Sequence, residues 1–224
     1  MKRSEINRLI GDAIIFLEKM NFWLPHWATW SPEMWKKQRK ECKEIIENGL
    51  GWDLTDFGTG NFLSTGLLLF TLRNGNLKRD KKTYSEKIMI VEEGQVTPMH
   101  FHWSKMEDII NRGGGNLMMD LYGSDKTEGL SDRPFEVRMD GIRRQFRPGD
   151  TVRLKPGDSI TLYQGLYHRF YGEPEKGRVL VGEVSAVNDD HTDNRFYDRV
   201  GRFPTIIEDE PPLHLLVGDY TKYI

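Results

Sequence analysis

Apolar residues near the start of the chain recur every three or four positions, with Lys and Glu between them. This spacing predicts an amphipathic helix over residues 4–20 with one buried face. A second helix is predicted to begin after Ser31, because Ser caps free amides and Pro32 suits the first turn. It is expected to run to about Asn48, where Gly49 ends it. The glycine-rich stretch 50–64 is predicted to be an ordered loop.

From Gly66 onward the pattern changes to short apolar and β-branched runs separated by turn sequences. Asn74-Gly75 and Asp140-Gly141 are typical of hairpins, and two Pro-Gly-Asp sequences mark further turns. Many short strands joined by tight turns predict a mainly β protein, an antiparallel sandwich or barrel. We expect one domain, with a helical extension over 1–60, a barrel over 61–190 and a tail over 191–224. The predicted strands are 67–72, 84–92, 116–122, 135–139, 142–146, 151–154, 159–162, 167–171 and 178–187.

Composition narrows the range of partners and compartments. The 224 residues include 32 basic and 34 acidic side chains, a formal net charge of -2. Because basic and acidic side chains nearly cancel, the protein has no strong positive or negative electrostatic potential overall. Neither nucleic acid nor a membrane surface is therefore indicated as a partner. No run approaches about 20 consecutive apolar residues, and the start of the chain does not resemble a signal peptide. Cys42 is the single cysteine, so no intramolecular disulfide is expected. A cytoplasmic location is predicted.

Two histidines and a glutamate between Gly94 and Gly114 have a spacing that suits one metal ion. His100 and His102 are two residues apart, so in a strand both imidazoles lie on one face. Their positions are about 7 Å apart along the backbone. Glu107 follows a turn and is expected to return on the neighbouring strand. These nitrogen and oxygen donors suit Mn, Fe, Co, Ni or Zn. The alternative is a chance His-x-His sequence on an exposed strand.

The residues from Gly94 to Gly114 fit G-x5-H-x-H-x4-E-x6-G, and this stretch resembles the first motif of the cupin barrels. The second cupin motif, G-x5-P-x-G-x2-H-x3-N, is matched from Gly157 to Gly172. Tyr163 stands where the family often has Pro, and Gly172 stands where it often has Asn. The resemblance implies a cupin-type, jelly-roll-like β-barrel and adds His168 to the ligands His100, His102 and Glu107.

Longer segments resemble the D-lyxose isomerases of the cupin superfamily. This resemblance implies metal-dependent interconversion of D-lyxose and D-xylulose, often also of D-mannose and D-fructose. It further implies Mn²⁺ as the preferred ion and a homodimer. For the reaction itself, a divalent ion on the substrate oxygens is expected to stabilise an enediolate, with a hydride shift as the alternative. The similar segments are EKI at 86–88, VEEGQVTPMHFHWSKMEDIINRGGGNL at 91–117, LYQGLYHRF at 162–170, GEVSAVNDD at 182–190 and DNRF at 193–196.

Three charged residues are candidates for the chemistry. Lys105 lies two residues before Glu107 and is predicted to share its face, where it would move a hydroxyl proton or stabilise an oxyanion. The alternative is a solvated lysine in a turn. Glu183 lies among apolar residues, and a buried carboxylate is costly unless it is paired or functional. We predict Glu183 as the base that acts on carbon, with a structural ion pair as the alternative. Lys87 is predicted as a further charged group at the substrate.

The polar segment over 188–196 is predicted to close over the sugar, with Asp190 and Arg195 at the mouth of the site; an exposed loop is the alternative. A basic phosphate cradle is not evident, so an unphosphorylated monosaccharide is the expected substrate. Two other functions use the same four ligands. A cupin dioxygenase would bind iron and oxygen there, and a non-catalytic cupin would bind a sugar without turnover.

Overall fold

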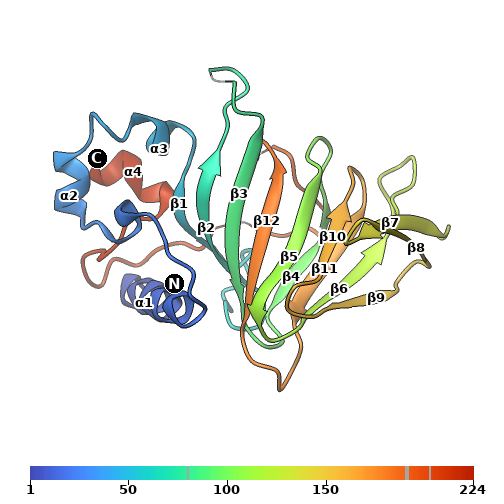
Figure 1. Ribbon diagram of the computed structural model, residues 1–224. Coiled ribbons are helices and arrows are strands. Elements are labelled where there is room, and N and C mark those ends of the chain that lie inside the picture. Colours follow the sequence, from blue (N-terminus) through green and yellow to red (C-terminus); the bar gives the residue numbers. More distant parts are fainter. Residues whose placement is uncertain (80, 190–191, 202) are drawn as a thin grey trace.

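The protein is described by a computed structural model that covers residues 1–79, 81–189, 192–201 and 203–224. Helices stand mainly at the N-terminus and strands fill the middle of the chain (Figure 1). No helix among these residues is long and apolar enough to cross a membrane. The helices are α1 (Arg3–Lys19), η1 (His26–Thr29), α2 (Pro32–Lys37), α3 (Lys43–Glu47), η2 (Val217–Asp219) and α4 (Tyr220–Tyr223). The strands are β1 (Gly51–Thr55), β2 (Leu67–Asn74), β3 (Tyr84–Val91), β4 (Val96–Phe101), β5 (Glu107–Gly114), β6 (Leu117–Tyr122), β7 (Phe135–Met139), β8 (Ile142–Phe146), β9 (Thr151–Leu154), β10 (Ser159–Leu162), β11 (Tyr167–Gly172), β12 (Val179–Ala186) and β13 (Arg195–Phe196).

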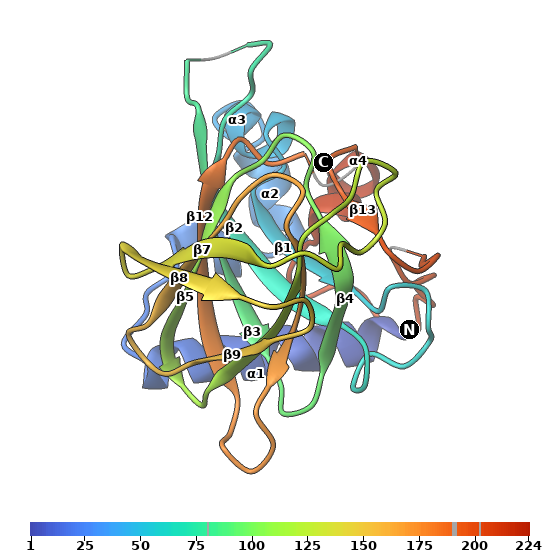
Figure 2. The same ribbon diagram turned by 90° about the vertical axis from the view of Figure 1, so that its right-hand side faces the viewer.

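Two antiparallel sheets face each other and form the barrel (Figure 2). The larger sheet has the order β1-β2-β3-β12-β5-β10-β7-β8, and the smaller has the order β13-β4-β11-β6-β9. The predicted mainly β architecture with N-terminal helices is therefore confirmed. The hairpin predicted at Asp140-Gly141 joins β7 to β8, and both residues have positive φ, as a tight hairpin turn requires.

Strand alternation decides which side chains reach the interior of the barrel. On β3, Met89 and Val91 join the core between the two sheets, whereas Ile88 and Ile90 face the opposite side. That outer side packs against the buried face of α1, which includes Ile6 and Ile10 among its fully buried residues. The helix thus covers the back of the larger sheet, and the front of the sheet is left to line the interior.

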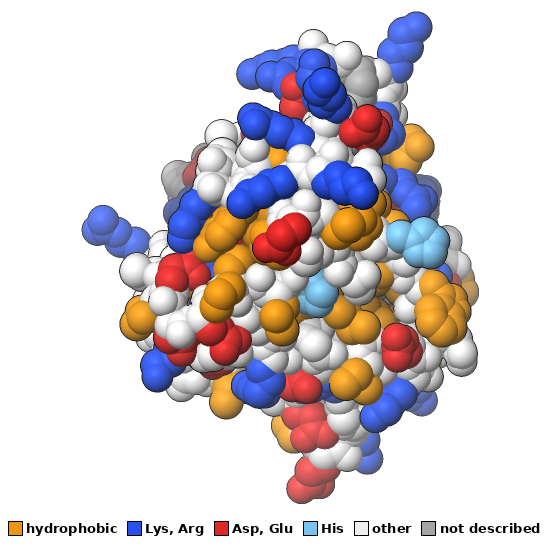
Figure 3. Space-filling view, turned by 90° about the vertical axis from the view of Figure 1, so that its left-hand side faces the viewer, with side chains coloured by type: hydrophobic (Ala, Val, Ile, Leu, Met, Phe, Trp, Pro, Cys, Tyr) orange, Lys and Arg blue, Asp and Glu red, His pale blue; other side chains and the backbone are white. Residues whose placement is uncertain are grey.

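The two ends of the chain are joined by a buried ion pair. Arg3 on α1 is fully buried, and its Nη2 lies 2.8 Å from the Oδ1 atom of Asp219 in η2. Its Nε also donates to Glu208 at 2.8 Å. Figure 1 shows both termini on the helical side of the molecule. Figure 3, which faces that side, shows hydrophobic side chains interspersed with Lys and Arg.

Replacing Arg3 by Met is expected to destabilise the protein by about 3–5 kcal/mol, because the Asp219 carboxylate would stay buried without its partner. Hydrogen bonds from Arg3 also hold the pKa of Glu208 at about 2, below its ordinary 4.5. A lowered pKa adds stability above pH 4.5, and that stability is lost as the pH falls toward 2. Between pH 4.5 and 2, the free energy of unfolding measured with urea should therefore decrease less for Arg3→Met than for the native protein.

The matched control for this prediction is Arg8→Met on the same helix. Arg8 forms an exposed ion pair with Asp12, and exposed pairs contribute only about 0–1 kcal/mol. If Arg8→Met and Arg3→Met destabilised the protein equally, the buried pair would not be the cause.

Two local predictions for the first third of the chain are wrong. The helix expected over 31–48 is two shorter helices, α2 and α3. Like charges at helical spacing, such as Lys36 with Arg39 and Lys40, oppose a continuous helix at the break. The loop expected over 50–64 begins instead with strand β1, which pairs with β2. β1 extends the larger sheet by one strand.

Candidate active site

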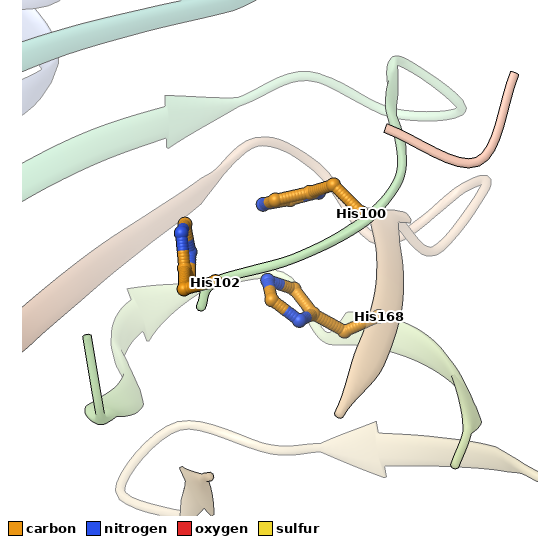
Figure 4. Close-up of side chains that lie close together, drawn as sticks. All are labelled: His100, His102 and His168. Atoms are coloured by element: carbon orange, nitrogen blue, oxygen red, sulfur yellow. The ribbon is translucent and has the colours of Figure 1, made fainter. Parts of the chain in front are cut away.

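Three histidines meet inside the barrel (Figure 4). His100 on β4 pairs in register with His168 on β11, so both side chains extend from the smaller sheet at the same level. His102 follows directly after β4 and turns toward them. One ring nitrogen of each histidine lies within 4.8 Å of the others, and all three residues are buried. Among the described residues this is the one cluster with the geometry of a metal site.

The backbone fixes the orientation of each imidazole. The Nδ1 atoms of His100, His102 and His168 lie 2.7, 2.8 and 3.0 Å from the carbonyl oxygens of Pro98, Asp193 and Leu166. A carbonyl only accepts hydrogen bonds, so each Nδ1 carries the hydrogen and donates it. Each Nε2 is left with a lone pair, which is the arrangement of a histidine that binds a metal.

The carboxylate of Glu107 lies beside two of these histidines and comes from the opposite sheet. Its Oε1 lies 3.3 Å from the Nε2 atoms of both His102 and His168. A carboxylate oxygen and a ring nitrogen at this distance need a proton or a metal ion between them. The arrangement therefore fits a divalent metal ion. The prediction that Glu107 returns on the strand beside β4 is wrong, because β5 belongs to the larger sheet and faces β4 across the interior.

The titration of these groups agrees with metal binding. Burial lowers the pKa of His100 well below its ordinary value, and the neighbouring histidines lower it further. Burial alone would raise the pKa of Glu107, but Lys105, His102 and His168 together outweigh burial and hold this pKa well below the usual range. His100 is therefore neutral and Glu107 is ionised near neutral pH, as ligands must be.

Beside the histidines lies a buried series of alternating charges. The Nζ atom of Lys105 is 2.7 Å from Glu107 Oε2 and 2.8 Å from Glu183 Oε1. Lys87 Nζ lies 3.6 Å from the same Glu183 oxygen, and Ser185 Oγ donates to that oxygen at 3.1 Å. Lys87 and Glu183 stand opposite each other in the register of β3 and β12. The structure thus brings Lys87, Lys105 and Glu183 to the metal ligands, as the sequence predicted.

These groups line one cavity of about 690 Å³, part of which is open to solvent. The charged residues occupy one portion of its wall, and much of the rest is apolar. Its apolar lining consists of Leu54, Phe57, Leu67, Leu69, Met89, Ile109, Phe170, Phe196 and Phe203. A small ligand with both polar and apolar faces fits such a wall.

The structure tests only one of the two residues predicted at the mouth of the site, Asp190 and Arg195. Asp190 lies outside the described residues. Arg195 is half-buried, but it does not belong to the described lining of the cavity. Its Nε donates to the Oε2 atom of Glu128 at 3.1 Å. Because side chains alternate along a strand, Asn194 and Phe196 reach the cavity and Arg195 points away from it.

Sequence reasoning missed three residues of this segment that contact the site. The Oδ1 atom of Asn188 accepts from Lys87 at 2.6 Å and from Lys105 at 3.2 Å. The carbonyl of Asp193 accepts from His102, and the ring of Phe196 stacks on His100 with centroids 5.3 Å apart. The GEVSAVNDD and DNRF segments contained the signal, but only Asp190 and Arg195 were predicted at the mouth of the site.

The departure of Gly172 from the cupin motif has a steric reason. A Cβ atom at this position would lie 2.6 Å from the carbonyl oxygen of Glu92. The Gly172 carbonyl also accepts from the amide of Gly94 at 2.8 Å. This close contact between the two motifs leaves no room for the asparagine side chain.

Comparisons with known proteins agree with the site. The sequence profile of the D-lyxose isomerase family matches residues 1–220. A protein of Serratia proteamaculans named D-lyxose/D-mannose isomerase is 47% identical over 227 residues, covering 100% of both chains. A protein of the same name from Escherichia coli O157:H7 is 47% identical over 226 residues, again covering 100% of both.

A solved structure shares the fold at much lower identity. The L-ribose isomerase of Cellulomonas parahominis, determined with L-ribose, has a TM-score of 0.61 and 16% sequence identity. The match covers 92% of this chain and 98% of that one. The two chains therefore share a fold.

Proposed function

Because the chain belongs to the D-lyxose isomerase family and is thus an aldose–ketose isomerase, we propose that it interconverts D-lyxose with D-xylulose and D-mannose with D-fructose. The observation that carries the proposal is the contact between Lys105 and Glu183 beside three metal-binding histidines. An aldose and its ketose differ by hydrogen positions at C1, C2 and their oxygens. The reaction therefore needs a base for carbon, a group that handles the oxygen proton, and a means of stabilising the enediolate.

His100, His102, His168 and Glu107 would hold the ion, for which Mn²⁺ is proposed. When bound, a divalent cation acts as a Lewis acid on the oxygens of C1 and C2 and lowers the energy of the enediolate. These four side chains line the cavity, so they would hold the ion where a sugar could reach it. The hydrogen bonds from the Nδ1 atoms to carbonyls hold the imidazoles in place before any ion or substrate arrives.

Glu183 is proposed to take the proton from C2 of the aldose and return it to C1. In the free protein Lys87, Lys105 and Ser185 all lie close to its Oε1 atom and hold it at the cavity wall. Lys105 is proposed to move the hydroxyl proton between O1 and O2. Its Nζ lies between Glu107 and Glu183, so it joins the metal ligands to the base. Lys87 orients Glu183 from the opposite side and is proposed to face the substrate.

The charges of the wall favour an unphosphorylated sugar. Lys87 and Lys105 are balanced by Glu107 and Glu183, so these four groups carry no net positive charge for a phosphate dianion. The apolar wall suits the carbon-bound hydrogens of a pentose or hexose, and Asn194 offers an amide for hydroxyl groups. The wall thus favours a monosaccharide of either length.

Purified protein loaded with Mn²⁺ is expected to convert D-lyxose and D-mannose to their ketoses, measured by ketose formation. Oxygen uptake by an iron-loaded sample would indicate the dioxygenase alternative instead. Sugar binding without turnover in folded, Mn²⁺-loaded protein would rule out the isomerase. A homodimer is a proposal from the family resemblance, and light scattering would test it. A cytoplasmic location is a proposal from the cysteine content and the pattern of the first residues.

A further inference from the structure

Asp193 contacts the site from a segment that lies far from it in sequence. The residue is buried, with 8% of its surface exposed. One carboxylate oxygen accepts from the backbone amide of Ser104 at 2.8 Å, and the other accepts from the amide of Lys105 at 2.9 Å. Its own carbonyl oxygen accepts from the Nδ1 atom of His102 at 2.8 Å. A single residue therefore contacts three residues of the turn between β4 and β5, namely His102, Ser104 and Lys105.

The turn held by Asp193 carries two groups of the proposed chemistry. His102 stands at its start, and Lys105 extends from it to Glu183. The segment that contains Asp193 is itself fixed to β4, because Arg195 pairs with Phe101 and the Tyr197 amide donates to the Met99 carbonyl at 2.9 Å. Asp193 thus lies between the edge of the smaller sheet and the turn.

From these contacts we infer that Asp193 is a positioning residue, which sets the ring of His102 and the backbone of Lys105 relative to each other. This inference rests on the proposed function for its effect on turnover, but its effect on metal binding and on the turn does not. Asp193 contacts the Nδ1 atom of His102 rather than its Nε2 atom, and it is not itself among the residues that line the cavity. Its influence must therefore pass through His102 and Lys105.

Removal of the carboxylate should release the turn in a defined way. In Asp193→Ala, the amide of Ser104 and the amide of Lys105 each lose the carboxylate oxygen that accepts from them. In Asp193→Asn, the side-chain NH₂ group is a donor and faces one of the two amide donors. The Asp193 carbonyl remains in both variants, but the segment that presents it to His102 is no longer fixed to the turn. Loss of such outer contacts of metal ligands typically costs about 10–100-fold in metal affinity or activity.

The test compares Asp193→Ala and Asp193→Asn with the native protein and with Asp198→Asn. Asp198 lies in the same segment and is exposed, so its substitution makes the same charge change without touching the turn. The first measurement is hydrogen exchange at the amides of Ser104 and Lys105 in metal-free protein, where we expect faster exchange in both Asp193 variants. The second is Mn²⁺ and Co²⁺ affinity by chelator competition, where we expect a loss of about 10–100-fold. Asp198→Asn should match the native protein in both measurements.

Turnover gives a third measurement. With saturating Mn²⁺, kcat on D-lyxose is expected to fall in both Asp193 variants while KM changes less than kcat, because Asp193 does not contact the sugar. The inference is overturned if exchange becomes faster but metal affinity and kcat stay native, since the contacts would then be purely structural. It is also overturned if exchange does not change. If the native protein bound metal but did not isomerise sugars, the proposed function would fail, and the affinity measurement would still decide the role of Asp193.

Discussion

Glu183→Gln is expected to lower kcat by roughly two to four orders of magnitude while the protein stays folded and binds Mn²⁺ as before. Glutamine keeps the size of the side chain and can still accept from Lys105, but its amide cannot take a proton from carbon. Glu183 is not among the metal ligands, so ion affinity should change little. Steady-state kinetics on D-lyxose, with metal content measured on the same sample, would check this result.

Glu86→Gln is the matched control for Glu183→Gln. Glu86 occupies the adjacent strand, one position from Lys87, and forms an ion pair with Arg73 on the other side of the sheet. Its substitution should leave kcat near the native value. Equal losses in both variants, or full activity in metal-loaded Glu183→Gln, would remove Glu183 from the role of base and leave it as a structural partner of the two lysines.

Removal of the metal is expected to abolish activity, and Mn²⁺ should restore it to the native chain but not to His168→Ala. The variant loses one of three nitrogen donors at the most buried of the three histidines. It also leaves Glu107 with one fewer contact for its Oε1 atom. Chelation followed by titration with Mn²⁺ and Co²⁺ measures both affinity and recovered turnover.

His26→Ala serves as the control for this experiment. His26 lies in η1 and is not part of the described lining of the cavity. The His26→Ala variant should bind Mn²⁺ with the affinity of the native chain and isomerise D-lyxose at the same rate. Full activity of the thoroughly chelated native protein would contradict the metal-dependent mechanism, whereas native affinity in His168→Ala would contradict the ligand assignment alone.

The sequence was most informative where function depends on strand periodicity. The two-residue spacing of His100 and His102 places both imidazoles inside the barrel, and alternation likewise places Lys87 and Glu183 on inner faces. These groups could be predicted because each needs only its own strand to be placed. His168 came from the second motif, since spacing within one strand cannot link residues so far apart.

Contacts between distant segments could not be predicted from local patterns. Glu107 was expected beside β4, but it faces β4 from the other sheet because the turn between them passes from one sheet to the next. In the segment over 188–196, charge suggested Asp190 and Arg195. Asp190 lies outside the described residues and Arg195 points away from the cavity, whereas Asn188 and Asp193 contact the site. A buried backbone carbonyl that orients a histidine leaves no mark in the composition of a sequence.

The ion pair between Arg3 and Asp219 has a consequence for the order of events during synthesis. The two residues are separated by 216 positions, so α1 is made first but cannot acquire its charged partner until almost the whole chain exists. The turn that carries His102 likewise waits for Asp193. Folding of so many sequence-distant contacts is slow. A growing chain would therefore hold its first helix without its charged partners until Glu208 and Asp219 have been added.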